Sequence, residues 1–141
     1  MNHESDFDKT HGTARPGNPP VEPLSVGSAR TSVKLELKCQ GRDFLLLVTG
    51  GEAHVGAVAV WDVQEQGSRA VVTELSGHRE GPLAGECAEI LGRASGRTVA
   101  AVVGIHQDNA SGEEIAAIVA NVRQGIKEMA KYYTNNNEDV P

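Results

Sequence analysis

Three short stretches of the sequence combine a histidine with glycines or with acidic, basic or amide side chains. They are Gly50, Gly51, Glu52 and His54; Gly77, His78, Arg79 and Glu80; and His106, Asp108 and Asn109. Imidazole and carboxylate groups are ligands of divalent ions such as zinc, iron and manganese. Glycine-rich turns, helix N-termini and an arginine favour a phosphate group. These stretches therefore predict a site for a metal ion, a phosphorylated ligand or both, if the fold brings them together.

The same residues also admit purely structural interpretations. A histidine at a strand end is most often a surface residue, and the sequence has neither an HxxxH nor an HExxH motif. Glu80 could simply favour a helix N-terminus, while Asp108 and Asn109 could be turn residues. Gly50 and Gly51 could serve only a hairpin turn. Nucleophilic catalysis is disfavoured, because the sequence contains no G-x-S-x-G elbow, Walker-type loop or Rossmann glycine fingerprint.

Hydrophobic patterning predicts the elements that must position these stretches. Strands are expected at residues 32–39, 44–48, 54–62, 69–75 and 98–106, and helices from Pro82 to the 92–96 region and from about Ser111 to Tyr133. Ser111 and Glu114 have the spacing of a capping box, and Ile115 begins an apolar stripe along the last helix. The order β-β-β-β-α-β-α predicts an α+β domain: a four-stranded antiparallel meander, a crossover helix, a fifth strand and a C-terminal helix, with the helices on one face of the sheet.

Composition and charge set the remaining expectations. One domain is expected over residues 31–134, preceded by a disordered arm at 1–30 and followed by a frayed tail at 135–141. The net charge of -6 argues against nucleic acid as a partner, and no apolar run reaches the length of a membrane span. Two cysteines, Cys39 and Cys87, suit a reducing cytoplasm, and Cys87 is expected in the core.

The expected topology makes a specific claim about where the three histidines lie. In a meander, the turn after the second strand and the end of the fourth strand share one edge of the sheet, which brings His54 near His78. If the helix from Pro82 is a crossover, the fifth strand runs parallel to the fourth or to a near neighbour and adds His106 to that edge. An antiparallel fifth strand would instead place His106 on the far side.

Three blocks of the chain, in this order, resemble the LpdD-like family. They are residues 50–58 (GGEAHVGAV), 77–81 (GHREG) and 104–110 (GIHQDNA). The family consists of small proteins described as prenylated-flavin chaperones, or as the small D subunit of hydroxyarylic acid decarboxylases, and the resemblance covers roughly residues 32–133. It implies a non-catalytic partner of UbiD-like decarboxylases that binds prenylated FMN, or FMN, and helps to deliver or maintain it. A separate flavin prenyltransferase makes that cofactor.

By position in these blocks, the resemblance implies roles for individual residues. His54, His78 and His106 are the candidate ligands of a divalent metal ion that bridges the cofactor phosphate to the protein. The candidate cofactor-binding residues are Gly50, Gly51, Glu52, His54, Gly77, His78, Arg79, Glu80, His106, Asp108 and Asn109. Two other functions stay open: a small metal-dependent hydrolase that uses the same histidines, and a purely structural decarboxylase subunit. Small residues along the third strand would also allow a homodimer.

Overall fold

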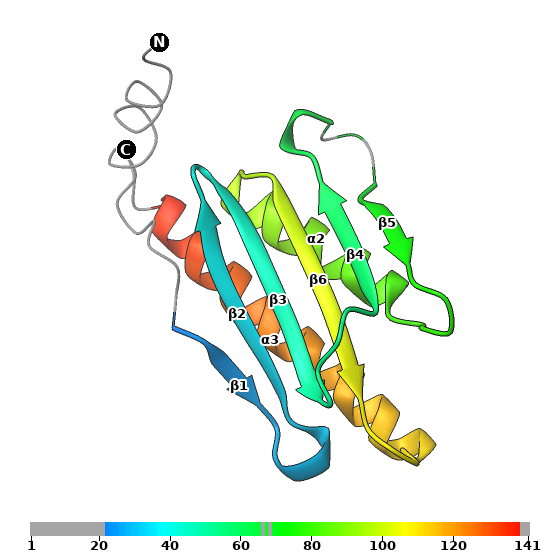
Figure 1. Cartoon of the computed structure of the whole chain (residues 1–141). Helices are drawn as coiled ribbons and strands as arrows, with labels where there is room; N and C mark the ends of the chain where they lie inside the picture. The colour runs from blue at the N-terminus through cyan, green and yellow to red at the C-terminus, as the bar shows by residue number, and fades with distance from the viewer. Residues whose placement is uncertain (1–21, 66, 68, 139–141) are drawn as a thin grey trace.

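The computed structural model describes residues 22–65, 67 and 69–138 of the chain. Within these residues, six strands form one mixed sheet in the order β1-β2-β3-β6-β4-β5. The strands are β1 (Leu24–Val26), β2 (Val33–Gln40), β3 (Asp43–Gly51), β4 (Ala57–Trp61), β5 (Val71–Glu74) and β6 (Val99–His106). The helices α2 (Gly81–Ser95) and α3 (Gly112–Glu138) lie on one face of the sheet, and the 3-10 turns are η2 (Ala29–Thr31) and η3 (Val63–Glu65) (Figure 1). The predicted α+β class, with the helices on one face, is confirmed.

The core lies between the sheet and the two helices. In β3, Phe44, Leu46 and Val48 are buried, whereas Leu45 and Leu47 are only partly covered. Successive side chains of a strand point to opposite faces, so the buried set faces the helices. Helix α3 packs the predicted stripe onto this layer through Ile118, Val122, Ile126, Met129 and Tyr133.

The predicted meander is wrong in one respect, because β3 and β4 are not neighbours. Strand β6 lies between them, parallel to β3 and antiparallel to β4. Its small and β-branched apolar residues suit a central position, where both faces of the strand are largely covered. The loop at residues 52–56 connects β3 to β4 across the end of β6, a distance that a two-residue hairpin turn could not span. Gly50 and Gly51 are instead the last residues of β3 and pair with Ile105 and His106.

Both ends of the domain extend further than predicted. Residues 24–26, expected in the disordered arm, form β1, which pairs with β2 and places Val26 in the core. Three residues are too few to produce a periodic signal, which is why the pattern missed this strand. Helix α3 continues to Glu138, into the stretch expected to fray. Residues 1–21 and 139–141 lie outside the described residues. In the part of the chain that the structure covers, neither helix combines the length and the hydropathy needed to cross a bilayer.

Candidate functional site

The three histidines predicted to share one edge of the sheet do share it. Strands β3 and β6 end together, and His54 follows β3 in the loop before β4. His78 lies in the loop between β5 and α2. The ring centroids of His54 and His78 are 4.6 Å apart, and those of His54 and His106 are 6.3 Å apart. Since β4 is antiparallel to both β5 and β6, these two strands run in the same direction, as the crossover argument required.

Glu80 completes a compact cluster with two of these histidines. Nε2 of His54 lies 3.2 Å from Nδ1 of His78 and 3.3 Å from Oε2 of Glu80. Nδ1 of His78 lies 3.6 Å from Oε1 of Glu80. The side chain of Glu80 is only 14% exposed, so this carboxylate is largely shielded from water. Such a convergence of imidazole and carboxylate groups can hold a divalent cation or share a proton.

Two backbone contacts orient the cluster. Nδ1 of His54 lies 3.1 Å from the carbonyl oxygen of Glu52. A carbonyl only accepts hydrogen bonds, so this contact places a proton on Nδ1 and directs Nε2 at the cluster. The backbone N–H of Ile105 donates to Oε2 of Glu80 at 3.1 Å. The end of β6 therefore holds the carboxylate in place.

His106 belongs to a second, more exposed group. Its Nε2 lies 2.9 Å from Oδ1 of Asp108, and a carboxylate oxygen of Glu52 lies within 4.8 Å of the ligand atoms of both. All three residues are exposed. The ligand atom of His106 is thus grouped with two acids, and not with the atoms of His54, His78 and Glu80 that approach one another.

Three glycines let the backbone come close enough to build this edge. A Cβ atom on Gly104 would overlap the backbone carbonyl group of His54, and one on Gly56 would overlap the carboxylate of Glu80. Gly51 has a positive φ of 59°, and a Cβ there would overlap the carbonyl oxygen of His106. A side chain at any of these positions would displace a residue of the site.

A pocket of about 350 Å³ opens beside the histidines, between the sheet edge and the two helices. Its lining residues are His54, Gly77, His78, Arg79, Glu80, Leu83, Ile105, His106, Gln107, Ala110, Ile115, Ile118 and Val119. One wall is therefore polar, and the other is built from aliphatic side chains. A larger pocket of about 480 Å³ lies between β5 and α2, but no histidine lines it. We place the candidate site where the imidazoles converge, because polar groups within an apolar pocket are typical of ligand sites.

The structure divides the predicted cofactor-binding residues into two sets. Those that line the pocket are His54, Gly77, His78, Arg79, Glu80 and His106, whereas Gly50, Gly51, Glu52, Asp108 and Asn109 do not. Asn109 is an exposed turn residue with a positive φ of 53°, which matches its structural interpretation. The helical pattern does not indicate the aliphatic wall, because Ile115 fits the same periodic stripe as the buried residues of α3. In the structure, Ile115 is 53% exposed and borders the pocket.

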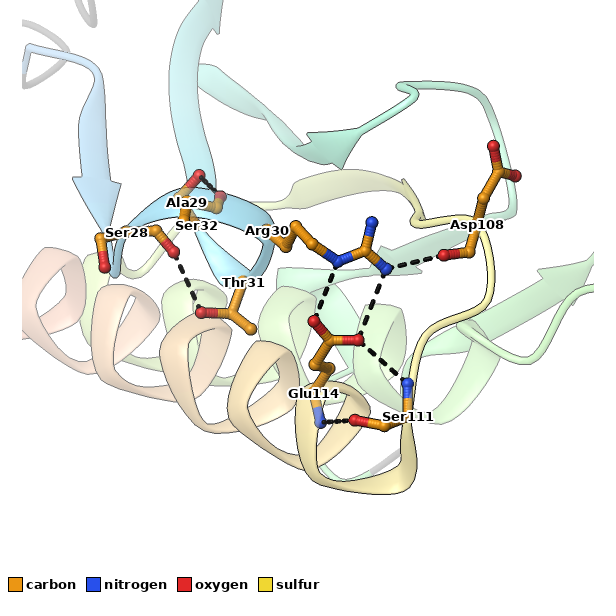
Figure 2. Close-up of polar contacts among 8 residues, drawn as sticks. All are labelled: Ser28, Ala29, Arg30, Thr31, Ser32, Asp108, Ser111 and Glu114. Carbon is orange, nitrogen blue, oxygen red and sulfur yellow. Dashed lines mark hydrogen bonds and ion pairs between the residues drawn. The ribbon is translucent and has the colours of Figure 1, made fainter.

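A polar network fixes the loop between β6 and α3, which follows His106 (Figure 2). The predicted capping box is confirmed, since the N–H of Ser111 donates to Glu114 at 3.0 Å and the N–H of Glu114 donates to Oγ of Ser111 at 3.1 Å. Arg30 donates to the carboxylate of Glu114 at 2.9 Å and to the carbonyl oxygen of Asp108 at 2.7 Å. The hydrogen bond from Arg30 lowers the pKa of Glu114. The N-terminus of α3 is thus already occupied by a carboxylate, which makes it a poor site for a phosphate.

The two cysteines do not add a reactive group to this site. Cys87 is fully buried in α2, as predicted, and burial raises the pKa of its thiol to about 12. It is therefore protonated at neutral pH, and a protonated thiol is a poor nucleophile. Cys39 is exposed, at the end of β2 that lies away from the histidines.

Comparisons with known proteins agree with this architecture. A chain from the crystal structure of a chaperone complex for yeast 20S proteasome assembly has a similar fold, with a TM-score of 0.54. The sequence identity is 9%, and the match covers 80% of this chain and 97% of that one. No curated protein matches the chain. The family model for the prenylated flavin chaperone LpdD-like domain matches residues 27–134. The chain, with its histidine edge and adjoining apolar pocket, therefore belongs to the LpdD-like prenylated flavin chaperone family.

Proposed function

We propose that this protein binds prenylated FMN at the histidine edge and acts as a cofactor chaperone for a UbiD-like aromatic acid decarboxylase in the cytoplasm. The observation that carries the proposal is the two-sided pocket, with histidines and Arg79 on one wall and aliphatic side chains on the other. Prenylated FMN has the matching division, since it joins a phosphate to a ring system that carries an apolar prenyl group. Membership of the family supports the same ligand.

Each end of the ligand has suitable neighbours in this pocket. The phosphate would lie by His78 and Arg79, with a divalent metal ion between it and the acidic groups of the edge. The ring system would lie against Leu83, Ile105 and Ile115, where burial of apolar surface contributes about 25 cal/mol per Å². The pocket volume of about 350 Å³ is at the small end for a ligand site, so part of the flavin would stay outside it. Partial enclosure suits a protein that must release its cofactor to another.

The proposed function predicts a specific flavin interaction. Reduced prenylated FMN, mixed anaerobically with the purified protein, is expected to co-elute with it at a ratio near one to one and to show a shifted absorption spectrum. FMN gives the comparison for the prenyl group, and EDTA tests the contribution of a metal ion. Adding the loaded protein to an apo UbiD-like decarboxylase should restore more activity than the free cofactor does. If no flavin co-elutes and the spectrum is unchanged in the presence of added metal, the proposal is wrong.

A second candidate function is a small metal-dependent hydrolase. It is favoured by the pair of histidines with one glutamate, because hydrolytic zinc sites use the same combination of ligands. The metal-loaded protein would then turn over a phosphoester, and His54→Ala would abolish the turnover. Hydrolysis by the loaded protein without any flavin binding would favour this candidate over the chaperone.

We further propose that two copies of the chain associate through the sheet face that the helices leave uncovered. Leu47, Val102 and Val58 form one row across this face, and Leu45, Ala100 and Val60 form the next. Beside these rows, β2 presents Lys34, Glu36 and Lys38, so a two-fold axis can set the lysines of one copy opposite the glutamate of the other. Apolar surface with complementary charges at its border is typical of an interface.

The variant Leu47→Glu is expected to shift the protein from dimer to monomer in analytical ultracentrifugation. The added carboxylate would be buried without a partner at the centre of the interface. Ala120→Glu adds the same charge on the exposed surface of α3 and should leave the dimer intact. A monomeric wild-type protein at micromolar concentration would contradict the proposal.

A further inference from the structure

We propose that His54, His78 and Glu80 bind one divalent first-row transition ion, with open coordination positions that face the pocket. His106, the third histidine of the edge, is not a ligand of this ion. The inference rests on the proposed function only for the phosphate that would approach the open positions, because the ion site itself is defined by this chain's own residues.

The spacing of the three donor groups fits a metal ion. Two ligand atoms that each lie about 2.1 Å from a tetrahedral zinc ion are about 3.4 Å from one another. The observed separations in the cluster are 3.2 Å for His54 to His78, 3.3 Å for His54 to Glu80 and 3.6 Å for His78 to Glu80. The two nitrogens and the carboxylate of Glu80 therefore converge at nearly the separations that one ion would require, with Oε2 nearest to His54 and Oε1 nearest to His78.

The surroundings of the cluster are those of a ligand shell. The carbonyl oxygen of Glu52 fixes the proton of His54 on Nδ1, and the N–H of Ile105 holds Glu80. Outer contacts of this kind commonly orient metal ligands in proteins. They direct Nε2 of His54 at the carboxylate of Glu80, 3.3 Å away. A proton or a metal cation between these two atoms stabilises the contact, and a metal ion can also bind His78.

Charge balance gives an independent reason for an ion. Glu52, Glu80 and Asp108 bring three carboxylates to the edge, and Arg79 contributes one positive charge to the pocket lining. A phosphate placed among these acids would be repelled. A divalent ion beside Glu80 reverses the sign of the local charge and can bind a phosphate oxygen directly.

Three protein ligands leave coordination positions of the ion open for a further ligand. Two histidines and one carboxylate occupy three positions, whereas zinc usually takes four ligands and iron takes more. All three residues line the 350 Å³ pocket, so the free positions face its interior. Glu52, His106 and Asp108 are all exposed and can approach a bound guest from the solvent side.

Cobalt titration of the full chain, dialysed against EDTA and then freed of it, tests the site without any flavin. One Co²⁺ per chain should bind and produce the visible absorption of a low-coordinate site. His54→Ala, His78→Ala and Glu80→Gln should each weaken binding by more than about 100-fold, since even loss of an outer contact can cost 10- to 100-fold. His106→Ala should change it by less than about 3-fold, because the ring of His106 binds Asp108 rather than one of the three ligands. Glu86→Gln on the surface of α2 is the matched control for Glu80→Gln.

A Cys variant keeps the test decisive if an alanine variant fails to fold. His78→Cys retains a ligand atom and should add a thiolate-to-cobalt charge-transfer band, which no outer role of His78 would produce. Absence of that band, absence of one-to-one binding, or loss of binding in His106→Ala would overturn the assignment. Cobalt binding without flavin binding would refute the proposed function alone. Flavin binding that is unchanged by EDTA and by Glu80→Gln, with no cobalt bound, would refute the ion site alone.

Discussion

Replacing Gly104 by alanine is expected to lower the free energy of unfolding by about 3 kcal/mol, the upper end of what overpacking usually costs. The added methyl group would overlap the backbone carbonyl of His54, and backbone cannot move aside as a flexible side chain can. Globular domains are stable by only about 5–15 kcal/mol, so this loss is a large part of the total. The displaced loop should also carry His54 away from His78 and Glu80. The cluster would then bind any ligand more weakly.

Urea denaturation of the purified variants measures this effect. Gly112→Ala is the matched control, because no atom lies within 4 Å of the position of its Cβ. Gly112 is also the first residue of α3, where alanine is at least as favourable as glycine. We expect this control to stay within about 0.5 kcal/mol of the wild type, as surface substitutions usually do. If Gly104→Ala has the same midpoint of urea unfolding as the wild type, the loop that carries His54 can accommodate the added methyl group, and the prediction is wrong.

Replacing Ile115 by glutamate is expected to weaken binding of reduced prenylated FMN by about 100-fold, which corresponds to about 2.7 kcal/mol. The carboxylate would face the apolar part of the ligand and would have to lose water when the flavin binds. The stability of the protein should change little, because Ile115 is 53% exposed and lies in the first turn of α3. An acidic residue near a helix N-terminus is favourable.

Equilibrium titration under anaerobic conditions gives the affinity. Ala116→Glu adds the same charge one residue along, at an exposed position that does not line this pocket. It should therefore bind the flavin nearly as well as the wild type does. Equal weakening in both variants would mean that net charge matters rather than contact with Ile115. If Ile115→Glu binds the flavin as tightly as the wild type does, the aliphatic wall is not part of the binding site.

Local features of the fold could be predicted because the signals that specify them lie close together in sequence. The capping box needs only Ser111 and Glu114, and the buried stripe of α3 needs only the helical period. The common edge for His54, His78 and His106 followed from strand directions, which the crossover helix determines. That conclusion survives the insertion of β6, since parallel neighbours end at the same edge whichever strand separates them.

The remaining features depend on contacts between distant segments. Nothing near Gly50 and Gly51 in the sequence indicates that β6 lies between β3 and β4. The hydrophobic alternation of β3 would be the same with β4 or β6 beside it. The ligand atoms of Glu80 and His106 could not be assigned from spacing for a similar reason. Their grouping depends on the N–H of Ile105, which holds Glu80, and on Asp108, which binds His106.

The central place of β6 also determines when the site can exist. His54 and His78 precede β6 in the chain, yet the loops that carry them are held together by this strand, in which Val99 pairs with Phe44 and His106 with Gly51. Such distant pairings form slowly, and a chain emerging from the ribosome lacks them until β6 is complete. A ligand that needs the whole edge can bind only the finished fold, and mass action then stabilises that fold against unfolding. Under the proposed function, the cofactor would therefore bind only chains that are complete and folded.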